Sequence, residues 1–184
     1  MAGGFRGWVL RSAEYLNEYE LDQFAVALDG CRVRARGDNL TRINSCAAEV
    51  GPWVAKKIFG PYTGAPAIGL ERHGEMVAGV LYENWNRRSV TCHIAVQGLL
   101  TPAYLAAIFH YPFVHLGCDK IIAPVSEGNA ESIKLVRNMG FREEARLHDA
   151  NPDGSLLLFT LERQKCRFIG ERYGKRLTVA TARA

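Results

Sequence analysis

Two residues near the middle of the chain could act as a general base. His93 lies in the stretch SVTCHIAVQ, and imidazole titrates near neutral pH, so it could take a proton from a substrate. Glu83 ends the preceding apolar stretch and could do the same with its carboxylate. A half-buried structural histidine and a solvated turn glutamate are the alternatives at these positions. Cys92 alternates with His93, so the two side chains point to opposite faces of a strand and cannot form a nucleophile–base pair. We expect Cys92 to be a core residue.

The start of a helix in EGNAESIKLVRNMGF, residues 127–141, is a second candidate site. Asn129 suits the N-cap, Glu131 suits the positive end of the helix, and Arg137 suits its negative end. Gly140 can adopt the left-handed conformation that ends a helix. Free amides at a helix N-terminus can also bind an anion. Asn129 is therefore either an ordinary cap or a ligand contact.

An alternation of strands and helices must position these residues. The apolar periodicity predicts, in chain order, a hairpin over residues 65–85, a strand over 89–97, a helix within 98–117, a strand over 119–126, a helix over 129–139 and two strands within 140–163. The hairpin turns at His73-Gly74. Thr101 and Pro102 suit the start of the first helix, and Pro112 predicts a kink or a restart before Phe113. The aromatic residues Phe109, Tyr111 and Phe113 are expected in the core. If the two central strands are parallel, both strand-to-helix junctions lie at the edge where α/β sheets bind ligands.

Length and composition limit the organisation of the chain. A length of 184 residues with 48% hydrophobic residues predicts one globular domain over residues 1–168. We expect a variable helical part over 1–64, with helices within 13–28 and 44–60 and a break near Gly51-Pro52, and a core over 65–168. A basic tail follows over 169–184. No stretch has signal-peptide or membrane-spanning character, so we expect a cytoplasmic protein that does not bind membranes. Five scattered cysteines predict no disulfide frame and no metal site.

The second half of the chain resembles the GNAT superfamily of acyl-CoA-dependent N-acyltransferases. The family's helix motif has Asn, a small residue three positions on, Leu three further, and Gly-Phe five and six after the Leu. It is matched by Asn129, Ser132, Leu135, Gly140 and Phe141. The stretches AGVLYENW, HIAV, IFHYPFVHLGC and LLLFTLERQKCRF most closely resemble acetyltransferase-like proteins of tailed bacteriophages.

The resemblance implies an α+β fold with three layers. A mixed, mostly antiparallel sheet has a central parallel strand pair that is splayed apart, with helices on both faces. In this family the pantetheine arm of acetyl-CoA lies between the splayed strands, and the pyrophosphate sits on the amides that open the following helix. The implied cofactor contacts of this chain are Ile94, Ala95, Val96, Gly98, Leu99, Leu100, Thr101, Ala103, Asn129, Ser132 and Leu135.

The chain departs from the family pattern at two places. The phosphate loop has Gln97, Leu100 and Pro102 where the family usually has Gln or Arg, then Gly, then Gly or Ala. Two positions that normally allow close approach of the backbone to the phosphates carry side chains here, and the proline lacks an amide. We therefore expect weaker or altered binding of the cofactor. Val136 stands where many members have the Tyr that protonates the CoA thiolate. The substitutes that remain open are a water, Ser132, Tyr104 and Tyr111.

Three functional hypotheses follow from the residues and the resemblance. The first is an N-acyltransferase that uses acetyl-CoA as co-substrate, with His93, Glu83 and Ser132 as catalytic candidates. Its acceptor would be a small amine, a protein amino group or a modified base. The second is a GNAT-like phage protein without catalysis that acts as a virion or host-interaction component. The third is a nucleic-acid-binding or DNA-modification-associated protein that uses the basic tail CRFIGERYGKR. A homodimer stays open for each hypothesis.

Overall fold

The computed structural model describes residues 41–58 and 60–174. In chain order its elements are β1 (Thr41–Asn44), α2 (Ala47–Lys57), β2 (Ala67–Arg72), β3 (Glu75–Glu83), β4 (Ser89–Val96), α3 (Pro102–His110), the π-helical turn η1 (Tyr111–His115), β5 (Lys120–Ser126), α4 (Ala130–Met139), β6 (Arg142–Asn151), β7 (Gly154–Glu162), the 3₁₀ turn η2 (Arg163–Lys165) and α5 (Glu171–Gly174). The helix expected within residues 13–28 and residues 175–184 of the basic tail lie outside the described residues. None of the described helices is both long and apolar enough to cross a bilayer.

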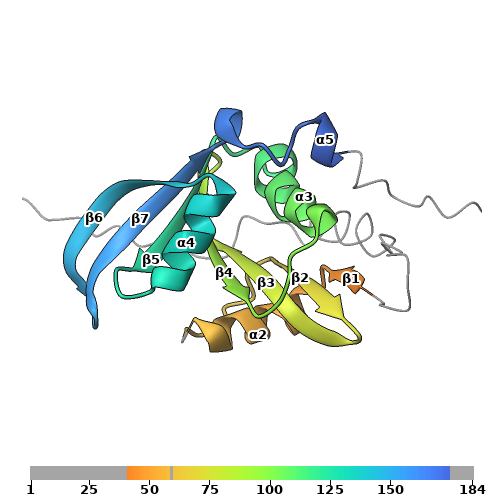
Figure 1. Cartoon of the computed structure of the whole chain (residues 1–184), viewed down its shortest axis with the longest axis horizontal. Coiled ribbons are helices and arrows are strands. Elements are labelled where there is room, and N and C mark those ends of the chain that lie inside the picture. Colours follow the sequence, from red (N-terminus) through yellow and green to blue (C-terminus); the bar gives the residue numbers. More distant parts are fainter. Residues whose placement is uncertain (1–40, 59, 175–184) are drawn as a thin grey trace, which may run out of the picture.

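The strands form one mixed sheet in the order β1-β2-β3-β4-β5-β7-β6 (Figure 1). Every neighbouring pair is antiparallel except β4 and β5. The hairpin between β2 and β3 turns at His73 and Gly74, which have φ angles of 55° and 81°. The expected hairpin and the expected central parallel pair are therefore confirmed.

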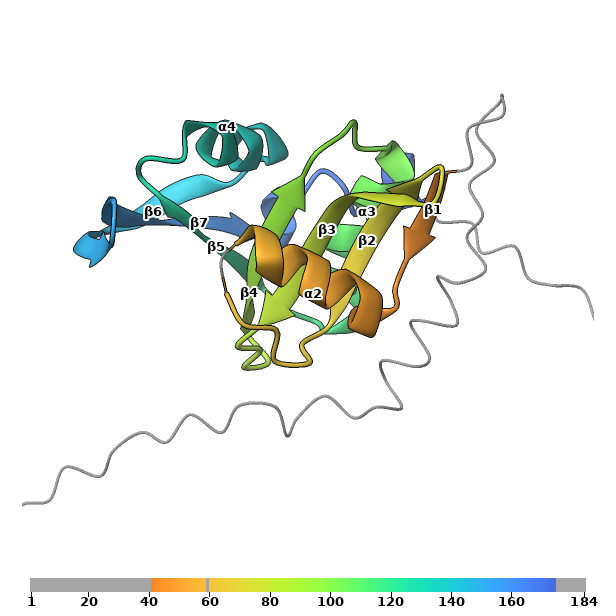
Figure 2. The same ribbon diagram turned by 90° about the horizontal axis from the view of Figure 1, so that it is seen from below.

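The parallel strands β4 and β5 pair only at their beginnings. Their register joins Ser89 to Lys120, Val90 to Ile121 and Thr91 to Ile122, and no described pairing continues beyond these three pairs. β4 runs on to Val96 beside β3, and β5 runs on to Ser126 beside β7. Figure 2 shows the two strands diverging from this short paired segment. We call residues 93–96 of β4, which face no strand on the β5 side among residues 41–58 and 60–174, the open edge.

Pro124 lies where the pairing stops, and it cannot continue the pairing. The amide of Glu127 donates to the carbonyl of Ser155 in β7 at 3.0 Å. The amide of Lys120 points the other way and donates to the carbonyl of Arg88, just before β4, at 3.2 Å. Backbone groups alternate between the two edges of a strand, so residue 124 faces β4. In the observed register the next ladder bond would need the amide of residue 124, and proline has none. Pro124 is tolerated inside the sheet because β5 is locally unpaired on that side.

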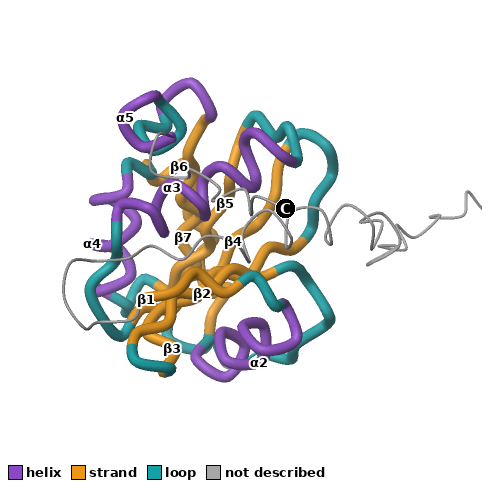
Figure 3. The backbone as a smooth tube through the Cα atoms, turned by 90° about the vertical axis from the view of Figure 1, so that its right-hand side faces the viewer, coloured by secondary structure: helices purple, strands orange, loops and turns teal. Residues whose placement is uncertain are grey.

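Helices cover both faces of the sheet. On one face Val50 and Val54 of α2 pack against Ala67, Leu81 and Ala95 of the sheet. The opposite face carries α3 and α4. Figure 3 shows α2 and α3 on opposite sides of the strands. The expected fold class is confirmed.

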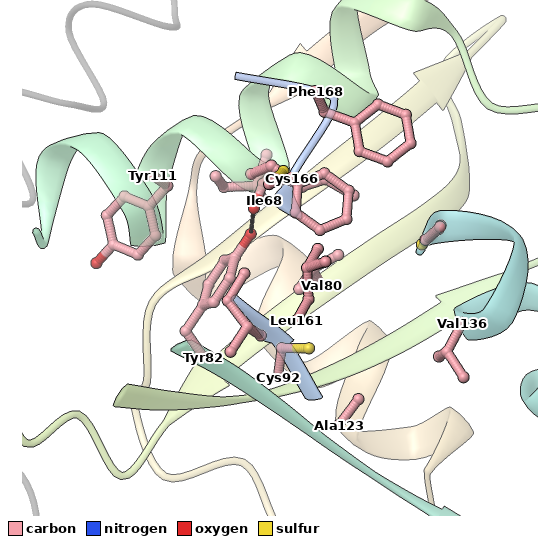
Figure 4. Packing of buried hydrophobic residues seen from close by; sticks show 14 of the residues in the cluster. Ile68, Val80, Tyr82, Cys92, Tyr111, Ala123, Val136, Leu161, Cys166 and Phe168 are labelled. Atoms are coloured by element: carbon pink, nitrogen blue, oxygen red, sulfur yellow. Dashed lines mark hydrogen bonds between the residues drawn. The ribbon is translucent and has the colours of Figure 1, made fainter. Parts of the chain in front are cut away.

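The main core lies between the sheet and α3. Its largest fully buried side chains include Tyr104, Phe109 and Phe159. The Tyr82 hydroxyl donates to the Ile108 carbonyl at 2.7 Å, which fixes β3 to α3. Cys92 belongs to the same buried cluster, and Figure 4 shows it near Tyr82, as expected of a core cysteine. Burial raises the pKa of its thiol to about 12.

The described region before residue 65 is only partly as expected. The helix expected within residues 44–60 is present as α2, but β1 also forms in this region and pairs with β2. The helix expected to break at Gly51-Pro52 is continuous, with Pro52 inside α2. Pro52 is exposed, so the missing hydrogen bond lies toward solvent, while Val50 and Val54 hold the other side of the helix on the sheet.

The helix after β4 changes type where the sequence predicted a break. α3 ends at His110, and the wider π-helical turn η1 begins at Tyr111 and contains Pro112. A π-type turn is one way in which a helix accommodates a missing amide. Phe109, Tyr111 and Phe113 are all buried, as expected.

Candidate active site

His93 and Glu83, which the sequence offered as alternative bases, form one pair. Leu81 is the register partner of His93, and Thr91 is the partner of Glu83, so both side chains lie on the face of the sheet that carries α2. His93 Nε2 lies 3.2 Å from Glu83 Oε2, and the two side chains are 23% and 25% exposed. The pair is thus half-buried and lies beside the open edge of β4.

The electrostatics of this pair suit a base. Burial lowers the pKa of His93 from its ordinary value of 6.5, and the charge and hydrogen bond of Glu83 oppose that shift. The imidazole is therefore mainly neutral at neutral pH. The carboxylate accepts the hydrogen bond from Nε2–H, which leaves Nδ1 with a free lone pair. Glu83 consequently orients a histidine that can take up a proton.

Thr63 extends this pair toward the loop that follows α2. Its Oγ1 donates to Glu83 Oε1 at 3.3 Å. The neighbouring Tyr62 packs so closely on α2 that a Cβ at Gly51 would lie 2.1 Å from its ring. No signal in the sequence indicates that Thr63 contacts Glu83, because this contact depends on how the loop after α2 folds back over the sheet.

The open edge of β4 offers backbone groups to a ligand. The Gln97 amide donates to the Val77 carbonyl of β3 at 2.8 Å. Neighbouring residues of an antiparallel strand point their amides to opposite edges, so the amides and carbonyls of Ile94 and Val96 face the β5 side. The β4–β5 pairing has already ended there. The amides and carbonyls of Ile94 and Val96, which would otherwise pair with β5, are therefore available to a ligand.

Burial decreases along β4 as the two strands separate. Val90 and Cys92 are buried on the face that carries α3 and α4, with Cys92 4% exposed. Ile94 and Val96, further along the same face, are only half-buried. Ala95 lies on the opposite face and packs under α2. Ile94 and Val96 are therefore partly exposed apolar side chains at the place where β4 and β5 separate. Such side chains suit contact with an aliphatic arm.

The start of α3 has fewer free amides than most helices. Thr101 is its N-cap and accepts a hydrogen bond from the Tyr104 amide at 3.1 Å. Pro102 has no amide, which leaves the amide of Ala103 in the first turn. In the preceding loop Leu99 is 79% exposed, so its side chain does not fill the space beside β4. Gly98 lies against Val77, and a Cβ there would be 3.2 Å from Val77 Cβ.

The start of α4 has the predicted cap. Asn129 Oδ1 accepts a hydrogen bond from the Ser132 amide at 2.9 Å, and the helix ends at Gly140 with a φ of 98°. Asn129 is exposed, whereas Ser132 and Leu135 are half-buried. The cap is confirmed, and the ligand contact of Asn129 stays a prediction.

The structure narrows the choice of a proton donor. The Tyr104 side chain is fully buried and its hydroxyl donates to the Ile68 carbonyl at 3.0 Å. Tyr111 is also buried, and burial removes both phenols from contact with a leaving group. Val136 is buried in the core. Of the side chains that the sequence left open, the half-buried Ser132 is the one that solvent can reach.

Solved structures share this architecture, although no protein-family model and no curated protein matches the sequence. A chimera of the Vibrio cholerae spermidine N-acetyltransferase SpeG with hSSAT has a TM-score of 0.54 at 13% identity and covers 71% of this chain and 99% of that chain. YncA from Salmonella typhimurium, solved with its cofactor acetyl-CoA, has a TM-score of 0.50 at 15% identity, covering 71% and 95%. Ard1 from Thermoplasma volcanium has a TM-score of 0.51 at 15% identity, covering 66% and 97%. The described part of this chain therefore has the GNAT fold, a mixed sheet with one splayed parallel pair between helices.

Proposed function

We propose that this protein is a cytoplasmic N-acetyltransferase that transfers an acetyl group from acetyl-CoA to an amine. The observation that carries the proposal is the open edge of β4 beside the His93–Glu83 pair. One element thus presents a row of unpaired backbone groups for a thioester carrier and a neutral histidine for the acceptor. Acyl transfer to an amine needs a deprotonated nucleophile and a polarised thioester carbonyl, which these two features would provide.

The two faces of the sheet would separate the two substrates. Ile94 and Val96 lie on the face with α3 and α4, where the carrier arm would pack against their side chains. His93 and Glu83 lie on the face with α2, from which the acceptor would approach. Because β4 and β5 diverge, the carrier arm and the acceptor could contact each other through the gap at the open edge.

The residues would act on different atoms of the reaction. His93 Nδ1 accepts the proton of the amine whose nitrogen forms the new bond to the acetyl carbon. An amide of the open edge, from Ile94 or Val96, donates a hydrogen bond to the acetyl oxygen as that oxygen gains charge. The carbon–sulfur bond breaks, and the leaving thiolate takes a proton from water or from Ser132.

Two of the similar structures support this reaction class. SpeG is a spermidine N-acetyltransferase, and YncA holds its cofactor acetyl-CoA. Both resemble this chain at low identity, so the identity of the amine rests on experiment. A small molecule, a protein amino group and a modified base remain the acceptor classes to test.

Thermal unfolding with and without acetyl-CoA tests the proposal. A ligand at 100 times its dissociation constant stabilises a protein by about 2.7 kcal/mol, so we expect a clear rise in Tm. Release of free CoA thiol in the presence of a panel of amines should then identify the acceptor. ADP serves as the control for a nonspecific polyphosphate effect. A Tm that acetyl-CoA does not change, together with no thiol release, would overturn the proposal.

Asn129→Ala is expected to weaken CoA binding and to destabilise the protein only slightly. Loss of an N-cap costs about 0.5–2 kcal/mol of stability. Asn129→Ser keeps a capping oxygen and is the matched control, because it separates the cap from a contact with the ligand. Titration calorimetry with CoA should show weaker binding for both variants. An affinity unchanged from that of the wild type would count against this part of the site.

The scarcity of amides at the start of α3 favours a second candidate. A GNAT-like protein of phage origin without catalysis would not need to hold phosphates. Such a protein would show no binding of acetyl-CoA and would associate stably with virion or host proteins. The nucleic-acid hypothesis predicts instead a DNA affinity that falls steeply with salt.

A further inference from the structure

Arg72, the last residue of β2, reaches the loop between β4 and α3. Its guanidinium Nη2 donates to the Leu99 carbonyl at 3.0 Å, across 27 positions of sequence. Side chains alternate along a strand, so Arg72 shares a face with Ile68 and Leu70. Both residues belong to the core that α3 covers. The guanidinium therefore lies on the face of the sheet that carries α3.

The charge of Arg72 has no carboxylate partner among residues 41–58 and 60–174. The neighbouring Glu71 pairs with Arg42 at 2.9 Å instead. The first turn of α3 contains no acidic residue. Arg72 uses one of its five N–H donors on Leu99, so the others remain for a ligand.

The hairpin and the loop are fixed to one another by backbone contacts. The pairing of β2 and β3 shifts after Leu70, which leaves Val77 opposite no β2 residue. The Val77 carbonyl accepts the Gln97 amide at 2.8 Å, and Gly98 lies against the Val77 side chain. Arg72 is consequently held at a defined distance from the loop and from the first turn of α3.

We propose that Arg72 binds the phosphate groups of the CoA carrier, an inference that rests on the proposed function. Leu100 and Pro102 occupy the two loop positions where small residues would let phosphate approach the backbone, and the helix start lacks two free amides. Pro102 has no amide, and the Tyr104 amide is bonded to Thr101. A guanidinium presents planar donors that match phosphate oxygens. The Arg72 side chain thus supplies the hydrogen-bond donors for phosphate that the backbone lacks here.

Calorimetric titration with CoA, dephospho-CoA and acetyl-pantetheine tests the proposal. Arg72→Gln removes the charge and keeps a donor for Leu99, and it should weaken CoA binding about tenfold to hundredfold, the range for a charged hydrogen bond. Binding of acetyl-pantetheine, which has neither the pyrophosphate nor the 3′-phosphate, should not change. If the loss persists with dephospho-CoA, Arg72 binds the pyrophosphate. If it disappears, Arg72 binds the 3′-phosphate.

Two further variants make the result specific. Arg72→Lys keeps the charge without the planar donors and should lose less affinity than Arg72→Gln. Arg142→Gln alters an exposed arginine on β6 at the far edge of the sheet and should bind CoA as the wild type does.

The failures of the two proposals can be told apart. Wild-type affinity in Arg72→Gln would overturn the role of Arg72 and leave the proposed function intact. An equal loss of acetyl-pantetheine binding would mean that Arg72 only shapes the loop, which also overturns its role. Failure of the wild-type protein to bind CoA would overturn both.

Discussion

His93→Asn is expected to lower kcat by about 10²–10⁴-fold, the usual contribution of a general base. Asparagine can still form a hydrogen bond with Glu83, but it cannot take up a proton near neutral pH. KM for acetyl-CoA should change little, because the carrier would be bound by the backbone of β4. Steady-state kinetics with acetyl-CoA and the amine found by thiol release would measure both constants. His148→Asn, on the exposed strand β6, is the matched control and should leave kcat unchanged.

The pH dependence of the reaction is a second test of the His93–Glu83 pair. The neutral imidazole is the active form, so kcat/KM should fall as the pH drops through the pKa of His93. Burial places that pKa below 6.5, while Glu83 raises it. Glu83→Gln removes the charge that raises the pKa, so the acidic limb should move to lower pH. An acidic limb at the same pH in wild type and Glu83→Gln would exclude His93 as the titrating base.

The elements that the sequence predicted best are those with local signals. The cap of α3 by Thr101 and the cap of α4 by Asn129 each depend on residues three positions apart. The turn at His73-Gly74 and the left-handed Gly140 depend on single residues with unusual φ angles. Such signals involve neighbours along the chain, so no knowledge of the tertiary fold is needed to find them.

The candidate site was only partly predictable because it joins distant residues. His93 and Glu83 could each be named as a base, but their pairing follows from the antiparallel register of β3 and β4. The contact of Arg72 with Leu99 has no sequence signal, since 27 positions separate the two residues. β1 escaped notice because four residues are too few to show a periodicity.

Pro124 gave a signal that only the sheet topology makes meaningful. A proline inside an apolar stretch usually argues against a central strand. β5 is nevertheless central, between β4 and β7. The apparent conflict disappears because β5 loses its β4 partner after Ile122, so residue 124 has the backbone environment of an edge strand. A residue type that disfavours a paired strand therefore marks the place where the strands separate.

Pro124→Ala is expected to close part of the open edge and to weaken the binding of acetyl-CoA. The new amide can donate to the Cys92 carbonyl, and the carbonyl of residue 124 can then accept the Ile94 amide, which extends the observed register by one step. Each bond contributes about 0.5–1.5 kcal/mol net. Acetyl-CoA would have to break both, so its affinity should fall about five- to 150-fold.

The stability of the variant distinguishes this effect from simple damage. Replacing proline adds freedom to the unfolded chain and costs about 0.4–1 kcal/mol, which is less than the two new bonds contribute. Tm without ligand should therefore stay the same or rise while CoA affinity falls. Pro152→Ala, in the exposed turn between β6 and β7, should show only the entropic cost and normal CoA binding. Amide hydrogen exchange should show protection of Ile94 in Pro124→Ala that is absent from the wild type. Wild-type CoA affinity together with an unprotected Ile94 amide would mean that features other than Pro124 hold the two strands apart.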